Sequence, residues 1–303
     1  MAHTIRSDLI VPEVLADAIA GEFAGMKALY GTGAAFVTAQ GWPDARGGDR
    51  IKIPYFGTIG EYEDLDSDED DGSGDLPALT PAKLSMTSET ATVAHSGKAV
   101  EITEWARIAA MYADPYAEMA RQLRVGLERL ADAKLLAAAS TTTLTHSIYQ
   151  EDGSGTPSWA DVLEARFKWG DEQDDIALIV MHSDVALRLL KELDGNDRPI
   201  WDNVLRSGQI PAEILGIPVK ISDRATKKAD YAETGSSATG YETLLIKRNA
   251  LAFWFSGGQP EVQTDKDILT DSVVAAIHVY YVAHRYSRLA GTTKTGVVKF
   301  IHN

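Results

Sequence analysis

The stretch that decides the fold is DPYAEMARQLRVGLERLADAKLLAAA, residues 114–139. It opens with Asp114, a type of residue favoured at a helix N-cap, and Pro115, which is favoured at the first helical position. Apolar residues then step by four and three along one side, and charged residues occupy the other. The apolar stripe is Tyr116, Ala120, Leu123, Leu127 and Leu130, and the charged side carries Arg121, Arg124 and Glu128. About 26 residues at about 1.5 Å each give a helix of about 39 Å, which is too long for a satellite element of a small domain, so we predict a spine helix.

Two extended segments precede this helix. Residues Asp49 to Tyr55 alternate apolar and charged side chains, which predicts a strand. The stretch from Leu84 to Ile102 is rich in Thr and Val, and we expect Gly97 within it to mark a bulge or bend. The residues between them, 57–81, include the acidic run Glu61 to Asp75. Because an isolated two-stranded ribbon is marginally stable in water, we expect residues 49–102 to lie on another surface, of this chain or of a neighbouring copy.

The remaining elements mix helices and strands. A short amphipathic helix is predicted before the first strand, and alternating helices and strands with short loops after the spine indicate a compact α/β unit. No internal repeat recurs at a fixed period. The predicted helices are Pro12 to Leu29, Ser158 to Lys168 and Asp184 to Leu193, the last capped by Ser183; the predicted strands are Ile176 to Met181, the segment after the turn at Ile214 to Val219, Thr243 to Lys247, Leu251 to Phe255, Val273 to Tyr286 and Val297 to Ile301.

Composition excludes several classes of protein. With 303 residues, 45% hydrophobic and 24% charged, the chain is an ordinary globular one. It has no cysteine, which excludes disulfides, thiolate metal sites and cysteine nucleophiles. Its net charge of −15 opposes tight binding to nucleic-acid phosphates. No apolar stretch approaches the ~20 residues that a bilayer requires, and the start lacks the apolar core of a secretory signal, so we expect neither a membrane span nor a signal.

Motifs for chemistry are missing or incomplete. A calcium loop read from Asp66 has Asp71 where glycine is needed and Pro77 where glutamate is needed, so a solvated loop tip is favoured over weak cation binding. None of the seven histidines has the i, i+4 spacing of a zinc protease, and His278 and His284 would lie about 20 Å apart on an extended strand. We find no nucleophile elbow, phosphate loop or dinucleotide fingerprint. We therefore predict no catalytic residue, no cofactor and no metal site, and we assign the aromatic run at 253–255 to a core or a subunit contact.

Read in order, these segments resemble the tailed-bacteriophage major capsid protein family, which has the Hong Kong 97-type fold. No single phrase is diagnostic, and the order of the phrases carries the resemblance over nearly the whole chain. The phrases are LIVPEV at 9–14, the long two-stranded segment at 49–98, GKAVEIT at 97–103, DP at 114–115, IVMHSDVALRLL at 179–190 and ILGIPVKISD at 214–223.

The resemblance implies an α+β fold with a spine helix, a peripheral domain, an axial domain, an extended E-loop and an N-terminal arm. The implied division is an N-terminal arm and helix at 1–47, the E-loop at 48–99, a peripheral domain at 100–153 with its spine at 115–139, an axial domain at 154–266, and return strands at 267–303. The arm begins within about ten residues of Met1, so a separate scaffolding protein is expected, or none. Some members form a covalent crosslink between lysine and asparagine, which cannot be matched here and is not predicted.

The function implied is self-assembly, without catalysis, into an icosahedral shell around phage double-stranded DNA. The partners implied are other copies of the chain, in hexamers and pentamers, together with scaffolding, portal and decoration proteins, and the location is the virion after assembly in the bacterial host cytoplasm. We expect the DNA to be enclosed without sequence-specific binding. The expected intersubunit contacts are Arg50, Lys52, Tyr55, Glu61, Asp66, Asp68, Lys83 and Lys98. An encapsulin-like nanocompartment shell and a hydrolase that uses surface carboxylates are the two alternatives.

Overall fold

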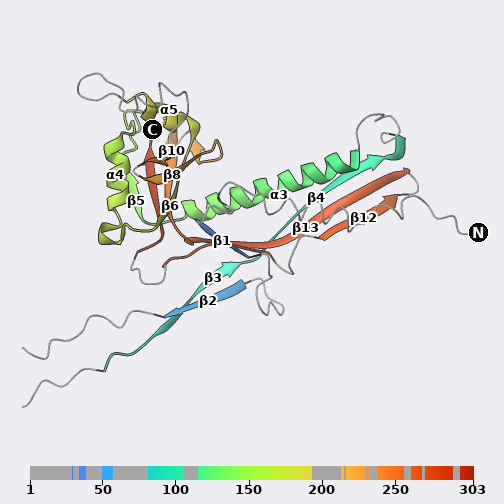
Figure 1. Cartoon of the computed structure of the whole chain (residues 1–303), viewed down its shortest axis with the longest axis horizontal. Coiled ribbons are helices and arrows are strands. Elements are labelled where there is room, and N and C mark those ends of the chain that lie inside the picture. Colours follow the sequence, from blue (N-terminus) through green and yellow to red (C-terminus); the bar gives the residue numbers. More distant parts are fainter. Residues whose placement is uncertain are drawn as a thin grey trace, which may run out of the picture.

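The structure is a computed structural model, and it describes residues 29, 34–38, 50–56, 81–105, 115–192, 213–214, 216–229, 231–232, 238–255, 261–267, 270–288 and 294–303. The predicted helix Pro12 to Leu29, apart from Leu29 itself, and the acidic run Glu61 to Asp75 therefore lie outside the described residues. The rest forms an elongated molecule with a helix-and-sheet body at one end and a long helix lying along a second sheet (Figure 1).

The predicted spine is confirmed as α3, Pro115–Ser140, a helix of 26 residues. Leu123 and Leu127 are buried as the pattern predicted, and the apolar stripe continues through Leu135 to the helix end. On the charged side Arg124 Nε lies 3.0 Å from Glu128 Oε1, one helical turn apart. The apolar stripe therefore faces the protein along the whole described length of the helix.

The sheet under the spine is centred on β13, Ser272–Arg285. One edge of β13 pairs antiparallel with β4, Ala94–Thr103. The other edge pairs first with β12, Glu261–Asp267, and then with β11, Leu251–Phe255. The short strand β1, Ala35–Thr38, adds to β11 in parallel. We call this five-stranded sheet the spine sheet.

The second sheet has seven strands and lies at the other end of the molecule (Figure 1). Its order is β5-β14-β10-β6-β8-β7, with β9 paired to β10. Helices α4, Trp159–Phe167, and α5, Ser183–Leu190, belong to this end of the chain, with the 3-10 turn η2, Gly170–Glu172. Its strands are β5 (Thr145–Ser147), β6 (Ile176–Met181), β7 (Glu213–Ile214), β8 (Ile217–Ile221), β9 (Lys227–Lys228), β10 (Gly240–Lys247) and β14 (Val297–His302).

Both faces of the seven-stranded sheet are buried, each in a different core. Successive side chains of a strand point to opposite faces. In β6, Leu178 and Val180 join the core beneath the spine helix, whereas Ile179 and Met181 join the core that contains α4 and α5. Because one strand contributes to both cores, the seven-stranded sheet connects the two ends of the molecule.

Several local predictions are confirmed and others are wrong. The hairpin between β7 and β8 turns at Gly216, whose φ of +74° suits glycine.

Gly97 is not a bulge, because it pairs in regular register with His278; the stretch from 84 to 102 is interrupted instead at Val93. Ser183 is not the N-cap of α5, because the His182 side chain accepts the capping bond from the Asp184 amide. The helix then ends at Leu190, earlier than predicted.

Candidate assembly surfaces

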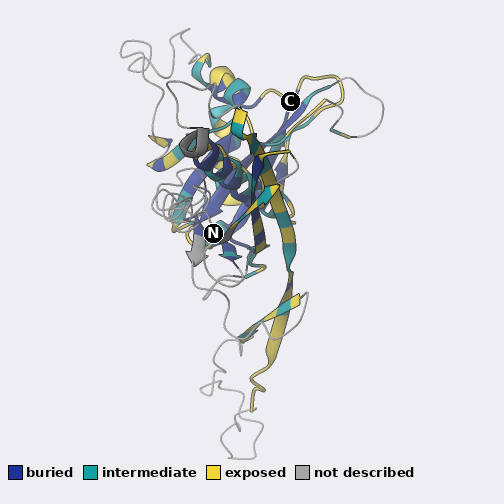
Figure 2. Ribbon diagram, turned by 90° about the vertical axis from the view of Figure 1, so that its right-hand side faces the viewer, coloured by how far each residue is buried: buried dark blue, intermediate teal, exposed yellow. Residues whose placement is uncertain are grey.

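A narrow two-stranded ribbon extends away from the body of the protein. It consists of β2, Arg50–Phe56, and β3, Met86–Thr92, which pair antiparallel from Arg50 opposite Thr92 to Phe56 opposite Met86. Among the described strands, these two pair only with each other. Figure 2 shows how far the ribbon projects and how much of it is exposed. The predicted strand at 49–55 and its pairing with the second extended segment are thus both present.

The two faces of the ribbon differ. Ile51, Ile53 and Tyr55 lie on one face and are half-buried, and Ala91, opposite Ile51, is buried. The other face is exposed and ends in a directly opposed pair, Phe56 and Met86, whose exposures are 65% and 66%. Large apolar side chains in such positions mark a surface that is expected to bind another molecule.

A third apolar side chain extends this patch. Leu84 lies two residues before the first residue of β3 and is 59% exposed. We call Phe56, Leu84 and Met86 the ribbon patch. A two-stranded ribbon is marginal by itself, and this one also exposes apolar surface.

The ribbon is held to the body by Glu89. Glu89 Oε2 lies 2.9 Å from His284 Nε2, and the two side chains are only 11% and 15% exposed. The backbone N–H of Ser287 donates to both Glu89 oxygens, at 3.0 and 3.2 Å. These bonds join β3 to the end of β13 and fix the direction in which the ribbon leaves the body.

A buried carboxylate makes the joint between the spine and the seven-stranded sheet. Glu242 of β10 accepts hydrogen bonds from Tyr231 Oη at 2.5 Å and from Ser140 Oγ, the last residue of α3, at 2.7 Å. Burial alone would raise the pKa of Glu242, but these bonds and Lys299, whose Nζ lies 3.7 Å away, lower it below its usual value. The carboxylate is therefore ionised and satisfied, which makes the joint rigid.

The residues predicted to contact other subunits fall in different places. Arg50 and Lys52 lie on the exposed face of β2, Tyr55 lies on the opposite, half-buried face, and Lys83 is exposed just before β3. Lys98 belongs to β4 instead, where it pairs with Ile277 and lines a groove beside the spine helix. The predicted residues Glu61, Asp66 and Asp68 lie outside the described residues. The contacts themselves stay predictions.

The ribbon patch was not among the predicted contacts, although the sequence contained a signal for it. In β2 the charged residues alternate with Ile51, Ile53 and Tyr55, and Phe56 falls in phase with the charged set. A large apolar residue on the polar face of a strand breaks the expected alternation of apolar and polar side chains, and such a break can mark an interface.

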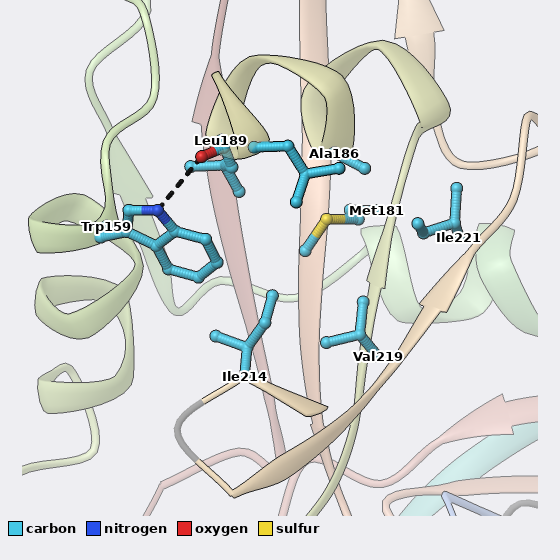
Figure 3. A pocket seen from close by; sticks show the side chains of 8 residues that line it. Trp159, Met181, Ala186, Leu189, Ile214, Val219 and Ile221 are labelled. Atoms are coloured by element: carbon cyan, nitrogen blue, oxygen red, sulfur yellow. Dashed lines mark hydrogen bonds between the residues drawn. The ribbon is translucent and has the colours of Figure 1, made fainter. Parts of the chain in front are cut away.

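The seven-stranded end has an apolar pocket, which Figure 3 shows. It is lined by side chains that include Trp159, Met181, Leu189 and Ile214, and the Trp159 indole N–H donates to the Leu189 carbonyl at 3.2 Å. Its volume of about 10 Å³ is at the lower limit for a single water molecule. Ligand sites are usually several hundred Å³ in volume, so this pocket is a packing gap in the core.

The aromatic run at 253–255 also belongs to a core. Phe253 and Phe255 are buried, and Phe253 stacks on Tyr281 with ring centroids 5.4 Å apart. His278 and His284, which the sequence placed on one strand, have different neighbours: His95 for the first and Glu89 for the second. None of the helices in the described ranges combines the length and hydropathy that a membrane span requires.

The described part of the chain has an α+β fold, made of a long helix on one sheet, a second sheet with its own helices, and a projecting ribbon. This is the fold of tailed-phage major capsid proteins, as the resemblance in the sequence implied.

Solved structures similar to this chain include the capsid of Ralstonia phage GP4, at a TM-score of 0.63 and 12% identity, over 91% of this chain and 88% of that one. The head structure of Helicobacter pylori bacteriophage KHP40 matches at 0.60 and 9% identity, over 93% and 91%. The capsid of an empty GTA particle matches at 0.59 and 12% identity, over 91% and 90%. No protein-family model and no curated protein sequence matches the chain.

Proposed function

We propose that this chain is a major capsid protein, which assembles with copies of itself into a closed icosahedral shell around phage double-stranded DNA. The observation that carries the proposal is the projecting ribbon, whose two strands have no other strand partner in the described structure and which ends in an exposed apolar patch. The fold shared with capsid structures over about nine tenths of both chains supports it.

In this proposal the ribbon lies on a neighbouring subunit. The described part of the body contains two buried hydrophobic cores, whereas the exposed face of the ribbon gains its missing contacts on assembly. Each contact can be weak, because every subunit repeats it and the repeated contacts add up in a closed shell. The domain division expected from the resemblance, with an E-loop at 48–99 and an axial domain at 154–266, is part of the same proposal.

The wider setting follows from this role. Scaffolding, portal and decoration proteins are the proposed partners, assembly takes place in the bacterial host cytoplasm, and the finished protein lies in the virion. The chain performs no catalysis in this role. Its net charge of −15 suits a wall that encloses DNA without binding it tightly.

Electron microscopy of the expressed full chain tests the proposal. We expect closed particles in negative stain, either from the chain alone or after co-expression with a scaffolding protein. A chain that sediments only as a monomer at high concentration under both conditions would contradict the proposal. The contents of particles purified from native cells distinguish the two kinds of shell. Packaged DNA supports the phage capsid, and packaged protein without DNA supports the nanocompartment.

A further inference from the structure

One edge of the seven-stranded sheet brings together a histidine and two carboxylates that shell assembly does not use. His146 lies in β5, and Asp161 and Glu164 lie three residues apart on α4, which contacts that strand. One ligand atom from each residue lies within 4.8 Å of the other two. His146 Nε2 and the nearer Glu164 oxygen are 3.7 Å apart, which is too long for a hydrogen bond.

The histidine nitrogen that faces the carboxylates is buried and has no hydrogen-bond partner. His146 is only 8% exposed, and its Nε2 is fully covered. The ring stacks on Phe300, with centroids 5.3 Å apart, and this packing holds the orientation of the ring. Buried polar atoms are normally satisfied, so Nε2 requires a partner at the position between the two carboxylates.

The Asp161 side chain is already oriented for such a partner. Its Oδ2 accepts the backbone N–H of Ser158 at 2.9 Å and the Ser158 hydroxyl at 2.6 Å, as part of the capping box of α4. A carboxylate has about four acceptor sites, so these two bonds leave capacity for another ligand. Hydrogen bonds that orient a carboxylate in this way are typical of the support around metal ligands.

We propose that His146, Asp161 and Glu164 bind a divalent transition-metal ion, with Zn²⁺ as the best match. Imidazole nitrogen and carboxylate oxygen are both zinc ligands, whereas Ca²⁺ and Mg²⁺ favour oxygen-only sites. Bonds of about 2.0–2.1 Å place two ligands of a tetrahedral ion about 3.3 Å apart. The pair at 3.7 Å needs only a small side-chain adjustment, and the full set, whose ligand atoms lie within 4.8 Å of one another, must close further around the ion. The Glu164 side chain is 68% exposed, and a water molecule completes the coordination from that side.

The ion would tie β5 to α4. Strand β5 has three residues and pairs only with β14 in the described structure, and it is the first element of the sheet after the spine helix. An ion that binds only the folded chain stabilises it by mass action. The proposed metal site therefore reinforces the edge of the sheet next to the end of the spine, and it is independent of the shell proposal.

Zinc titration of the full chain tests the site. After removal of metals with a chelator, we expect calorimetry to show one saturable Zn²⁺ per chain, and we expect Co²⁺ to give the visible absorption of a tetrahedral site. Glu164→Gln should weaken binding about tenfold or more while leaving the circular dichroism unchanged, because the side chain is largely exposed. His146→Gln should abolish the Co²⁺ spectrum.

Glu151→Gln is the matched control, because Glu151 is an exposed carboxylate in the nearby turn and outside the cluster. It should bind zinc like the unaltered chain. Absence of saturable binding, or equal affinity in the Glu164→Gln and unaltered chains, would overturn the proposal. Particle formation is scored separately, so failure of the metal site leaves the shell proposal intact.

Discussion

The ribbon patch gives a prediction that separates folding from assembly. In the single chain the Phe56 side chain is 65% exposed, so replacing it with alanine removes little packing from the folded subunit. Complete burial of a phenylalanine contributes about 1.5–3 kcal/mol. About two thirds of that, or about 1–2 kcal/mol, is still to be gained when a neighbour covers the side chain, which corresponds to about a 5- to 30-fold change in the affinity of one contact.

Sedimentation across a concentration series measures this effect. Phe56→Ala should require a higher protein concentration to form particles than the unaltered chain, under identical scaffold conditions. Ser88→Ala is the matched control, since Ser88 lies on the same exposed ribbon face and loses no apolar surface. The reasoning is refuted if Phe56→Ala assembles at the same concentration as the unaltered chain, or if its thermal unfolding midpoint falls markedly, which would place the side chain in the core of its own chain.

Three further predictions concern the folded chain itself. Burial lowers the pKa of His302 to about 4, below its unfolded value of 6.5, so the unfolded chain binds more protons as the pH falls between these values. The free energy of unfolding should therefore drop by about 3 kcal/mol from pH 6.5 to pH 4. In urea melts the His302→Gln variant should lack this drop. If the unaltered chain and the variant lost the same free energy of unfolding over this pH range, the prediction would be wrong. A Cβ added at Gly97 lies 3.0 Å from the Ile277 carbonyl, whereas one at Gly126 meets nothing within 4 Å, so Gly97→Ala should lower the thermal midpoint and Gly126→Ala should not. Glu89→Ala should speed hydrogen exchange in β2 and β3 but not in α3, and unchanged ribbon exchange would show that Glu89 does not anchor it.

The parts of the fold that could be predicted are those in which local periodicity and core packing agree. Residues 114–139 carry both a cap signal and a helical stripe, and β2 alternates in phase with its burial. The failures involve partners that are distant in sequence. Whether the stretch from 84 to 102 is one strand depends on β13, which pairs with it only from Ala94 onward. The polar strand β12 has little strand signal of its own and forms because β13 offers it an edge.

The candidate sites were harder to predict, for a related reason. Most of the contacts expected from the sequence are charged residues such as Arg50 and Lys52, because charge can be recognised without a structure. The exposure of the Phe56 side chain depends on the fold. In the sequence, its only signal is that Phe56 falls on the same side of β2 as the charged residues. The Asp161 and Glu164 spacing is common on helices, and His146 lies on another element, so no local pattern unites the three.

The structure also shows which part of residues 49–102 could depend on a neighbouring subunit for its stability. If all of residues 49–102 folded back onto their own molecule, the shell proposal would lose its physical basis. Residues 94–102 do fold back, since β4 pairs with β13 along its whole length. Strands β2 and β3 join neither of the two larger sheets, and β3 contacts the body at β13 and through Glu89. The ribbon is therefore an arm attached to the body near the end of β13. The body determines its direction, and in the shell proposal a second molecule covers its exposed face.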